Sequence, residues 1–277
     1  MKMSISAVIL NFNRPDYIKN NIIPSLEKIE TINEIIVSHG KKETIFDHPS
    51  IKSLDHTGTY NKEWGLSLRF LSGKEAKNDT IIIMDDDIIP AEKTVNFLNQ
   101  NIEKDSKRIH GIYGRSFNSG DYEVTNVFGE VPIVLTRLLI CKKEMCQYYV
   151  DNFRKYESEL VKNSKPYWNG EDILFSLLSI QKYKNLPKAF NLSHENRIWN
   201  YINLKDSISL DSSHLNYRKD VSKYFLENIE GVKEIIKNKE NISKTKNQFS
   251  YFLQNCNILL VLISFVTFIF LFYRVYI

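Results

Sequence analysis

Cysteine is scarce in this sequence: the 277 residues include only Cys141, Cys146 and Cys256. An odd and sparse count provides no disulfide framework, and these spacings do not match a zinc site. We therefore expect free, buried thiols in a reducing compartment.

A strong excess of charge of either sign is also absent. The 37 Lys and Arg residues and the 33 Asp and Glu residues leave a net charge of +4, and the two signs are interleaved along the chain. Because no basic stripe forms, nucleic-acid binding is not expected. Hydrophobic residues at 43% and charged residues at 25% are typical of a globular chain and argue against wholesale disorder.

The N-terminus lacks the features of a signal peptide, since its apolar stretch is short and runs into a charged segment. A long hydrophobic run lies at the other end, where residues 257–273 carry no charge. Its length, about 17 residues, is at the short end of the range for a membrane-spanning helix. All-round hydrophobicity, with Tyr273, Arg274 and Tyr276 at the far end, favours a transmembrane anchor over a buried terminal helix.

The charges that flank this run predict its orientation. Five lysines precede it and only Arg274 follows it; the five are Lys233, Lys237, Lys239, Lys244 and Lys246. Under the positive-inside rule, the body of the protein lies on the cytoplasmic side of the membrane. The expected organisation is a catalytic domain over residues 1–231, a basic neck over 232–255 and a C-terminal anchor over 256–277.

Hydrophobic periodicity predicts an α/β fold. Buried strands are expected at residues 6–12, 33–40 and 79–86, with helical segments between them at 13–29 and 60–73. Alternating strands and helices predict a mainly parallel central sheet flanked by helices on both faces. In such sheets the ligand crevice lies beyond the carboxyl ends of the strands.

The second half of the chain is less regular. Residues 109–117 and 127–150 are expected to form further strands and then a helix, and residues 167–183 a loop that enters another helix. The segment 186–231, rich in Ser, Asn and His, is expected to be irregular.

Three consecutive aspartates, Asp85–Asp87, follow the apolar residues 80–84. Like charges repel one another, and burying an unpaired carboxylate is costly, so a compensating positive charge is expected. Carboxylate oxygens suit Mg²⁺ or Mn²⁺, which commonly share their remaining positions with water and substrate phosphates. The pattern favours a metal–diphosphate site over the alternative, a solvated acidic turn.

A second acidic group, Glu171 and Asp172, falls in the first turn of a predicted helix. Negative charge is favoured there by the helix dipole, so a purely structural role is one interpretation. In the other interpretation, one of the two carboxylates lies against a sugar in the crevice. It would orient an acceptor hydroxyl or stabilise an oxocarbenium-like transition state.

These motifs together resemble a known family. A strand that ends in DDD, followed by the segment NGEDI about eighty residues later, resembles the C-terminal glycosyltransferase domain of the exostosins, glycosyltransferase family 64. The segments NFNR, GIYGR, VLTRLLICKKE and HLNYR resemble further family motifs in the same order. The resemblance covers about residues 4–229, and it implies a GT-A (nucleotide-diphospho-sugar transferase) fold.

The resemblance also implies an activity. It implies Mn²⁺-dependent (or Mg²⁺-dependent) transfer of a sugar from a UDP-sugar to a glycan or glycoprotein acceptor, with retention of anomeric configuration. By position, the residues expected to bind the donor are Asn13, Arg14, Asn61, Arg69, Asp85, Asp86 and Asn169. Asp87 is expected to ligate the metal.

The catalytic residues implied by the resemblance come from the later motifs. Asp172, with its neighbour Glu171, is expected beside the reacting carbon, and Arg218 near the diphosphate, where it would offset leaving-group charge. Arg115 and Trp199 are further candidates for the site.

Two departures from the family pattern stand out. Gly170 occupies a position where family members usually carry Cys, so any cystine there is absent. The animal exostosins are anchored near their N-terminus and face an oxidising lumen, whereas the anchor expected here is C-terminal.

Two other functions are compatible with parts of the pattern. A nucleotidyltransferase also uses paired aspartates on a strand, but no glycine-rich phosphate loop follows the first strand, and the NGED segment would have no role. A non-catalytic glycan-binding relative would keep the fold without needing Asp172. The identity of the donor sugar (a HexNAc, xylose or a hexose) rests on a few contacts, each worth about 1–3 kcal/mol.

Overall fold

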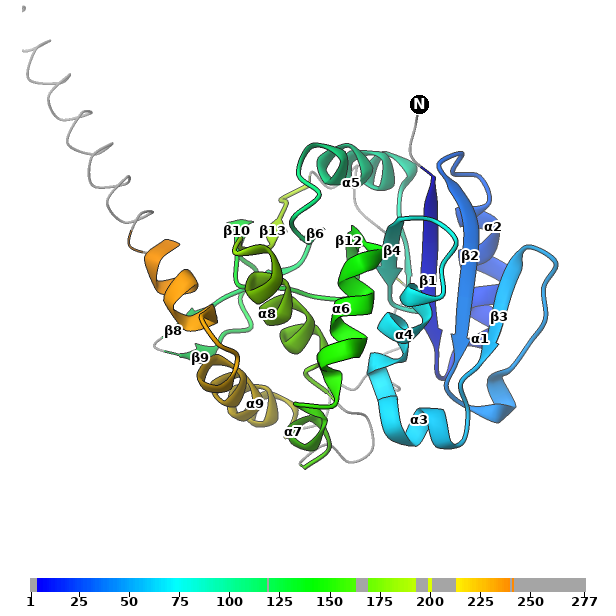
Figure 1. Ribbon diagram of the computed structural model, residues 1–277. Helices are drawn as coiled ribbons and strands as arrows, with labels where there is room; N and C mark the ends of the chain where they lie inside the picture. Colours follow the sequence, from blue (N-terminus) through cyan, green and yellow to red (C-terminus); the bar gives the residue numbers. More distant parts are fainter. Residues whose placement is uncertain are drawn as a thin grey trace, which may run out of the picture. The chain divides into compact units, whose positions relative to one another are not determined.

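A computed structural model of the chain describes residues 4–118, 120–162, 169–192, 199–200, 213–239 and 241 (Figure 1). The chain divides into two compact units, Met1–Lys233 and Glu234–Ile277. In the described part of the chain, no helix is both long and apolar enough to cross a bilayer. The predicted anchor, residues 256–277, lies outside the described residues, as does Cys256.

The first unit alternates strands and helices. Its strands are β1 (Ile5–Asn11), β2 (Ile32–His39), β3 (Ile51–Asp55), β4 (Thr80–Met84), β5 (Ile88–Ile89), β6 (His110–Gly111), β7 (Gly114–Arg115), β8 (Phe117–Asn118), β9 (Asp121–Tyr122), β10 (Gly129–Glu130), β11 (Ile133–Val134), β12 (Leu138–Lys142), β13 (Lys188–Ala189) and β14 (Trp199–Asn200). Its helices are α1 (Pro15–Tyr17), η1 (Ile18–Ile22), α2 (Ile23–Leu26), η2 (Lys42–Thr44), α3 (Thr59–Trp64), η3 (Gly65–Ser67), α4 (Leu68–Lys74), α5 (Glu92–Lys104), α6 (Lys143–Phe153), α7 (Glu157–Lys162), α8 (Glu171–Tyr183) and α9 (His214–Asn228).

An eight-stranded sheet with the order β10-β13-β6-β12-β4-β1-β2-β3 forms the centre. The strands β4, β1, β2 and β3 are parallel, whereas β12 runs antiparallel to both β4 and β6. The predicted α/β fold with a mainly parallel sheet is therefore confirmed. The strands form because β-branched residues dominate them, as in β4, where Ile81, Ile82 and Ile83 are fully buried.

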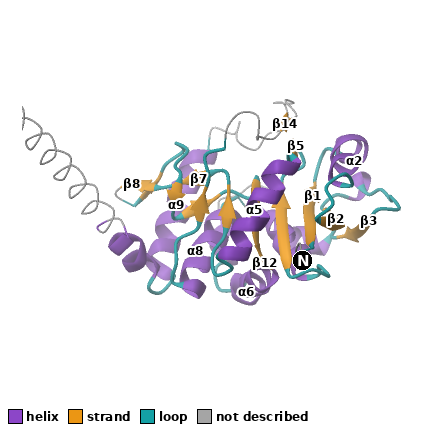
Figure 2. Cartoon of the chain, turned by 90° about the horizontal axis from the view of Figure 1, so that it is seen from above, coloured by secondary structure: helices purple, strands orange, loops and turns teal. Residues whose placement is uncertain are grey.

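Helices cover both faces of the sheet; Figure 2 shows α2 and α6 on opposite sides of the strands. On one face, Ile5, Ile9 and Ile82 share a hydrophobic cluster with residues of η1, α2 and α5. On the other face, Phe70 of α4 stacks on Phe175 of α8 with 4.0 Å between ring centroids. These packed helices fix the residues at the carboxyl ends of the strands.

Strand order places a topological switch between β1 and β4. From β1 the chain proceeds to β2 and β3 on one side, and then returns to place β4 on the other side. Ligand crevices of open α/β sheets form at such a point. Residues 12–14 leave β1 there, and Asp85–Asp87 leave β4 beside them.

Two expectations about secondary structure were wrong. The helix expected over 60–73 is interrupted at Gly65, whose φ of 48° and ψ of −128° cannot continue a helix. The segment expected to be irregular contains α9, a helix of 15 residues. Its buried residues Tyr217, Val221 and Phe225 recur every four positions, a helical pattern that the surrounding polar residues obscured.

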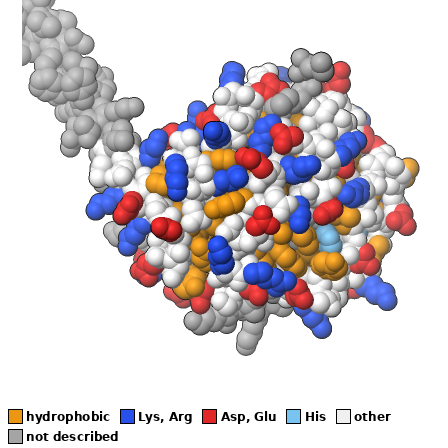
Figure 3. All heavy atoms as spheres, viewed as in Figure 1, with side chains coloured by type: hydrophobic (Ala, Val, Ile, Leu, Met, Phe, Trp, Pro, Cys, Tyr) orange, Lys and Arg blue, Asp and Glu red, His pale blue; other side chains and the backbone are white. Residues whose placement is uncertain are grey.

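The surface seen in Figure 3 carries both signs of charge. Lys and Arg side chains are interspersed with Asp and Glu over this face, with hydrophobic side chains between them. Below the surface, the thiols of Cys141 and Cys146 are free and buried, as expected.

Candidate active site

The first feature of the site is a partly buried ion pair across the switch point. Arg14, just after β1, donates through Nη1 to Asp86 Oδ1, just after β4. Burial of Asp86 raises its pKa to about 6, although Arg14 acts in the opposite direction. Arg14 therefore binds the loop after β1 to the loop that carries the three aspartates.

Arg69 of α4 holds the first aspartate. Its Nη1 lies 2.8 Å from Asp85 Oδ1, and its Nη2 lies 3.7 Å from Glu171 Oε1. Burial lowers the pKa of the Arg69 guanidinium, but Asp85 and Glu171 outweigh burial, so the pKa is raised. Arg69 thus links the aspartates after β4 to the acids at the start of α8.

Asp87 differs from its two neighbours. Its Oδ1 is buried and has no hydrogen-bond partner among the described residues. Burial and the charge of Asp85 raise the pKa of this carboxyl group. A buried carboxylate oxygen without a donor is costly, so this atom is suited to a ligand that supplies positive charge.

The protein oxygen atoms at this site fit a metal ion that takes most of its remaining ligands from phosphates and water. Among the described residues, no three His, Cys, Asp or Glu side chains gather to hold a metal ion. Asp85 and Asp86 are committed to arginines, which leaves Asp87 as the suitable carboxylate of the three. Mg²⁺ and Mn²⁺ accept one or two carboxylates when phosphates and water complete their coordination.

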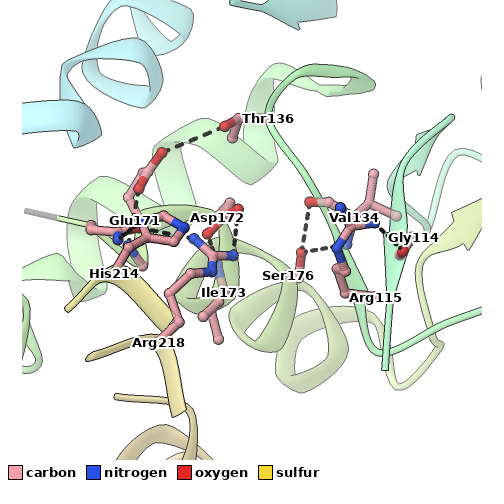
Figure 4. A network of polar contacts seen from close by, with 12 residues as sticks. Gly114, Arg115, Val134, Thr136, Glu171, Asp172, Ile173, Ser176, His214 and Arg218 are labelled. Carbon is pink, nitrogen blue, oxygen red and sulfur yellow. Dashed lines mark hydrogen bonds and ion pairs between the residues drawn. The ribbon is translucent and has the colours of Figure 1, made fainter. Parts of the chain in front are cut away.

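The second half of the site lies where α8 begins (Figure 4). Arg218 of α9 donates to Asp172 Oδ2 and to Asn169 Oδ1, each over 2.9 Å. The Asn169 amide in turn lies 2.6 Å from His214 Nδ1, and the Arg218 guanidinium lies 4.5 Å from the ring centre of Tyr122. Arg218, Asp172 and Asn169 are all buried, so the hydrogen bonds among them are shielded from water.

Glu171 points away from Asp172, toward Thr136 (Figure 4). Its Oε1 lies 3.5 Å from Thr136 Oγ1, and its Oε2 accepts the backbone N–H of Gly170 over 3.2 Å. Burial and the neighbouring charge of Asp172 raise its pKa to about 7, whereas Arg69 and Arg218 act in the opposite direction. Glu171 therefore changes its protonation close to neutral pH.

Local backbone geometry explains how the two acids become buried at a helix start. Gly170 has a φ of 109°, a conformation that favours glycine, and a Cβ there would lie 3.0 Å from Val221 Cγ1. This geometry accounts for the glycine at position 170. One turn further on, Ser176 Oγ bonds both the N–H and the C=O of Val134, which fastens α8 to β11 (Figure 4).

The remaining predicted residues are not part of these networks. Asn13 Oδ1 accepts a hydrogen bond from Lys41, and Asn61 lies within α3, where its backbone carbonyl accepts the N–H of the C-cap residue Gly65. Arg115 donates to Asn126 and to the carbonyl of Gly114. Neither Asn61 nor Arg115 forms one of the described contacts with the aspartates.

The backbone of Trp199 lies close to the aspartates. In β14, Trp199 pairs with Ile89 of β5, two residues beyond Asp87. A segment more than one hundred residues away in the sequence therefore returns to the crevice.

Sequence reasoning missed three contributors: Tyr122, Thr136 and Arg137. The Arg137 carbonyl accepts the N–H of Asp85 over 3.2 Å, and the Arg137 guanidinium lies 4.9 Å from the ring centre of Tyr113. A cation directly before the strand β12 was visible in the sequence. The pairing of β12 with the end of β4 was not visible, because the local sequence of a strand does not identify its partner strand.

A sheet switch point lined by acids and arginines is typical of enzymes that bind nucleotide phosphates. Sequence comparison identifies the enzyme class as a glycosyltransferase. The chain belongs to the glycosyl transferase family 64, whose domain model matches residues 5–263. A comparison with curated proteins found no significant match.

Proposed function

We propose that this enzyme has a GT-A fold and transfers a sugar from a UDP-sugar to a hydroxyl group of a glycan, with retention of configuration and with Mn²⁺ or Mg²⁺. The observation that carries this proposal is Asp87. Its buried Oδ1 lacks a partner among the described residues, at the switch point of the sheet, while arginines hold the two aspartates before it. The family supports the transfer of a sugar, and the aspartates support a diphosphate donor.

Donor binding is assigned to the residues around the switch point. The nucleotide and the sugar would be held by Asn13, Arg14, Asn61, Arg69, Asp85, Asp86 and Asn169. Asp87 would bind the metal ion, which when present stabilises the negative charge of the departing diphosphate. Arg69, held between Asp85 and Glu171, and Arg218, paired with Asp172, are the cations that we assign to the same leaving group.

Asp172 is the group that we place beside the reacting carbon. Its Oδ2 accepts from Arg218, and its Oδ1 accepts the N–H of Ile173 over 2.8 Å. Because both oxygens are engaged, these contacts favour stabilisation of a positively charged transition state over nucleophilic attack. Retention is then best explained by displacement on the same face of the sugar, with Arg218 fixing the Asp172 carboxylate.

The test is a screen for UDP release by the full chain in mild detergent. UDP-GlcNAc, UDP-GalNAc, UDP-xylose, UDP-glucose and UDP-galactose are each supplied with Mn²⁺ or with EDTA. We expect release from one donor, dependent on Mn²⁺ and lost in Asp87→Asn. The matched control is Asp151→Asn, which changes an exposed aspartate on α6 and is expected to leave release unchanged.

The outcomes separate the competing functions. Mn²⁺-dependent binding of UDP without release from any donor, with or without candidate acceptors, would favour a non-catalytic glycan-binding relative. Neither release nor Mn²⁺-dependent UDP binding would overturn the proposal.

We also propose that residues 256–277 anchor the enzyme in a membrane, with the catalytic domain on the cytoplasmic side. The support is the uncharged run 257–273 and the lysines before it. If this is right, the expressed chain sediments with membranes, resists carbonate extraction, and is digested by protease added to the cytoplasmic side of sealed vesicles. Release by carbonate would contradict the anchor, and protection from protease would contradict the orientation.

A further inference from the structure

The first turn of α9 presents two side chains to a single amide group. His214 and Arg218 are four residues apart on α9, so they lie on the same face of this helix, beside the start of α8 (Figure 4). Both contact the side chain of Asn169, two residues before α8. His214 Nδ1 lies 2.6 Å from Asn169 Nδ2, and Arg218 Nη1 donates to Asn169 Oδ1 over 2.9 Å.

These two contacts fix the roles of all the atoms involved. Arginine carries only N–H donors, so the Asn169 atom that faces Arg218 must be the carbonyl oxygen. The amide nitrogen of Asn169 then faces His214, and because this nitrogen only donates, His214 Nδ1 must accept. Nδ1 of His214 therefore carries no proton, and the proton of the neutral ring is on Nε2.

Burial makes both contacts of Asn169 important. Asn169 and Arg218 are buried, and both polar atoms of the Asn169 side chain are used, one by each partner on α9. Loss of either partner leaves a buried polar atom of Asn169 without a hydrogen bond, which is costly. The amide is thus held in one orientation between His214 and Arg218.

The orientation of Asn169 affects the reaction centre through Arg218. Nη1 of Arg218 binds Asn169, and Nη2 of the same guanidinium binds Asp172 Oδ2. Because a guanidinium group is planar and rigid, a shift of one hydrogen bond changes the direction of the other. Asn169 therefore influences how Arg218 meets Asp172.

We propose that His214 is a positioning residue of the reaction centre: its unprotonated Nδ1 holds the Asn169 amide, and Asn169 in turn holds Arg218 against Asp172. This inference rests on the proposed function, which places Asp172 beside the reacting carbon. It also gives a physical reason for the spacing of His and Arg in the segment HLNYR. One acceptor and one donor, a helical turn apart, match the two polar atoms of one carboxamide.

The first test measures turnover of the donor from which UDP is released, with the full chain in mild detergent. His214→Asn keeps an acceptor atom as far along the side chain as Nδ1, so kcat is expected to stay within about threefold of the wild type. His214→Leu leaves an N–H of Asn169 unpaired, so kcat is expected to fall about tenfold. Rescue by Asn but not by Leu separates the hydrogen bond from the mere filling of space.

A double-mutant cycle tests whether His214 acts through Asn169. In an Asn169→Ala background, His214→Leu is expected to lower kcat by less than about twofold, because the contact is already lost. The matched control is His48→Leu, since His48 Nδ1 also accepts an N–H, that of the Ser50 backbone over 3.3 Å. His48 lies between η2 and β3, and its replacement is expected to leave turnover unchanged.

The second test needs no turnover. Nitrogen-15 spectra of the full chain, labelled at histidine, report which ring nitrogen carries the proton. The signals of His214 are those that are missing from the spectrum of His214→Asn. At about pH 8, where histidine is ordinarily neutral, we expect His214 to carry its proton on Nε2 and none on Nδ1.

Each result bears on a different claim. Wild-type kcat in His214→Leu, or an equal loss in His214→Asn and His214→Leu, overturns the role of His214. The same fold loss with and without Asn169→Ala overturns the path through Asn169. If His214→Leu does not fold, the spectra still decide, since a proton on Nδ1 overturns the inference. If the wild type releases UDP from no donor, the proposed function fails, whereas the spectra still test the contact with Asn169.

Discussion

Arg218 Nη2 lies 2.9 Å from Asp172 Oδ2, and both side chains are almost completely buried, with relative exposures of 6% for Arg218 and 7% for Asp172. This contact joins the first turn of α8 to α9, forty-six residues further along the chain. Because neither charge reaches water freely, each depends on the other. The same pair that we place at the reacting carbon therefore also stabilises the fold.

Breaking this pair is expected to destabilise the protein. Asp172→Ala leaves a buried guanidinium without its carboxylate, and a loss of about 3–5 kcal/mol in the free energy of unfolding is expected. Arg218→Ala is expected to cost a similar amount. The double variant is expected to lose clearly less than the sum, because no lone buried charge remains. Urea denaturation of the four proteins measures these differences, and strictly additive losses would show that the two side chains are not coupled.

This coupling affects how loss of activity is interpreted. Asp172→Asn keeps an oxygen that accepts from Arg218 and is expected to remain more stable than Asp172→Ala. If Asp172→Asn folds and binds UDP but does not release UDP from the donor sugar, the negative charge of the carboxylate is required for catalysis. If it turns over donor at the wild-type rate, Asp172 acts only in the structure.

The protonation of Glu171 predicts a pH dependence of stability. Its folded pKa of about 7 lies above the value of about 4.3 expected for an unfolded chain. The folded protein therefore binds the proton more tightly, so this group favours folding at low pH, and that contribution is lost as the pH rises from about 4.3 to about 7. Glu171→Gln mimics the protonated form.

We expect Glu171→Gln to raise the melting temperature relative to the wild type at pH 8 and to change it little at pH 5. The gain in unfolding free energy at pH 8 is at most about 4 kcal/mol. Thermal scans of both proteins between pH 5 and pH 8 measure this difference. The buried histidines also titrate with pH, but they are the same in both proteins, so their effect cancels in the difference. Glu27→Gln, an exposed change, is the control. A difference that does not vary with pH would contradict the raised pKa.

Close packing of α4 against α6 gives a third prediction. A Cβ added at Gly73 would lie 2.7 Å from the sulfur of Cys146, which is fully buried. Gly73→Ala is expected to lower the free energy of unfolding by about 1–3 kcal/mol, the usual cost of overpacking. Adding Cys146→Ala removes the obstructing sulfur and is expected to recover part of that loss. Equal stability of Gly73→Ala and the wild type in urea would show that the two helices move apart easily.

The metal assignment predicts a linked stabilisation. UDP with Mn²⁺, at about one hundred times its dissociation constant, is expected to add about 2.7 kcal/mol to the free energy of unfolding. EDTA is expected to abolish this increase, and so is Asp87→Asn, which removes a charged oxygen that has no partner among the described residues. Differential scanning calorimetry provides the measurement, with Asp151→Asn as the control. A full stabilisation by UDP in EDTA would argue against a metal at Asp87.

The sequence predicted the strands near the switch point well, because they are short, buried and rich in Ile and Val. The expected strand at 33–40 corresponds to β2 (Ile32–His39), and the aspartates do follow β4. The sequence pattern also placed Glu171 and Asp172 in the first turn of a helix, where α8 begins. In these places local composition and tertiary burial favour the same structure.

What the sequence could not predict depends on contacts between distant segments. The helix α9 was missed because its polar residues obscured a narrow buried stripe. Arg137 was missed because its importance comes from pairing with Asp85 across β12 and β4. The sequence predicted that positive charge would balance the aspartates and assigned it to a metal ion, whereas arginines from separate elements already provide much of it.

The contact of α9 with the start of α8 has a consequence for synthesis. The parallel strands β1–β4 and their helices come from the first third of the chain and can pack as soon as they leave the ribosome. Arg218 is made more than one hundred residues later, and until it emerges, Asp172 lacks its buried partner. A nascent chain can thus form the switch point between β1 and β4 early, but the buried pair of Asp172 and Arg218 forms only when nearly all of the first unit has been translated.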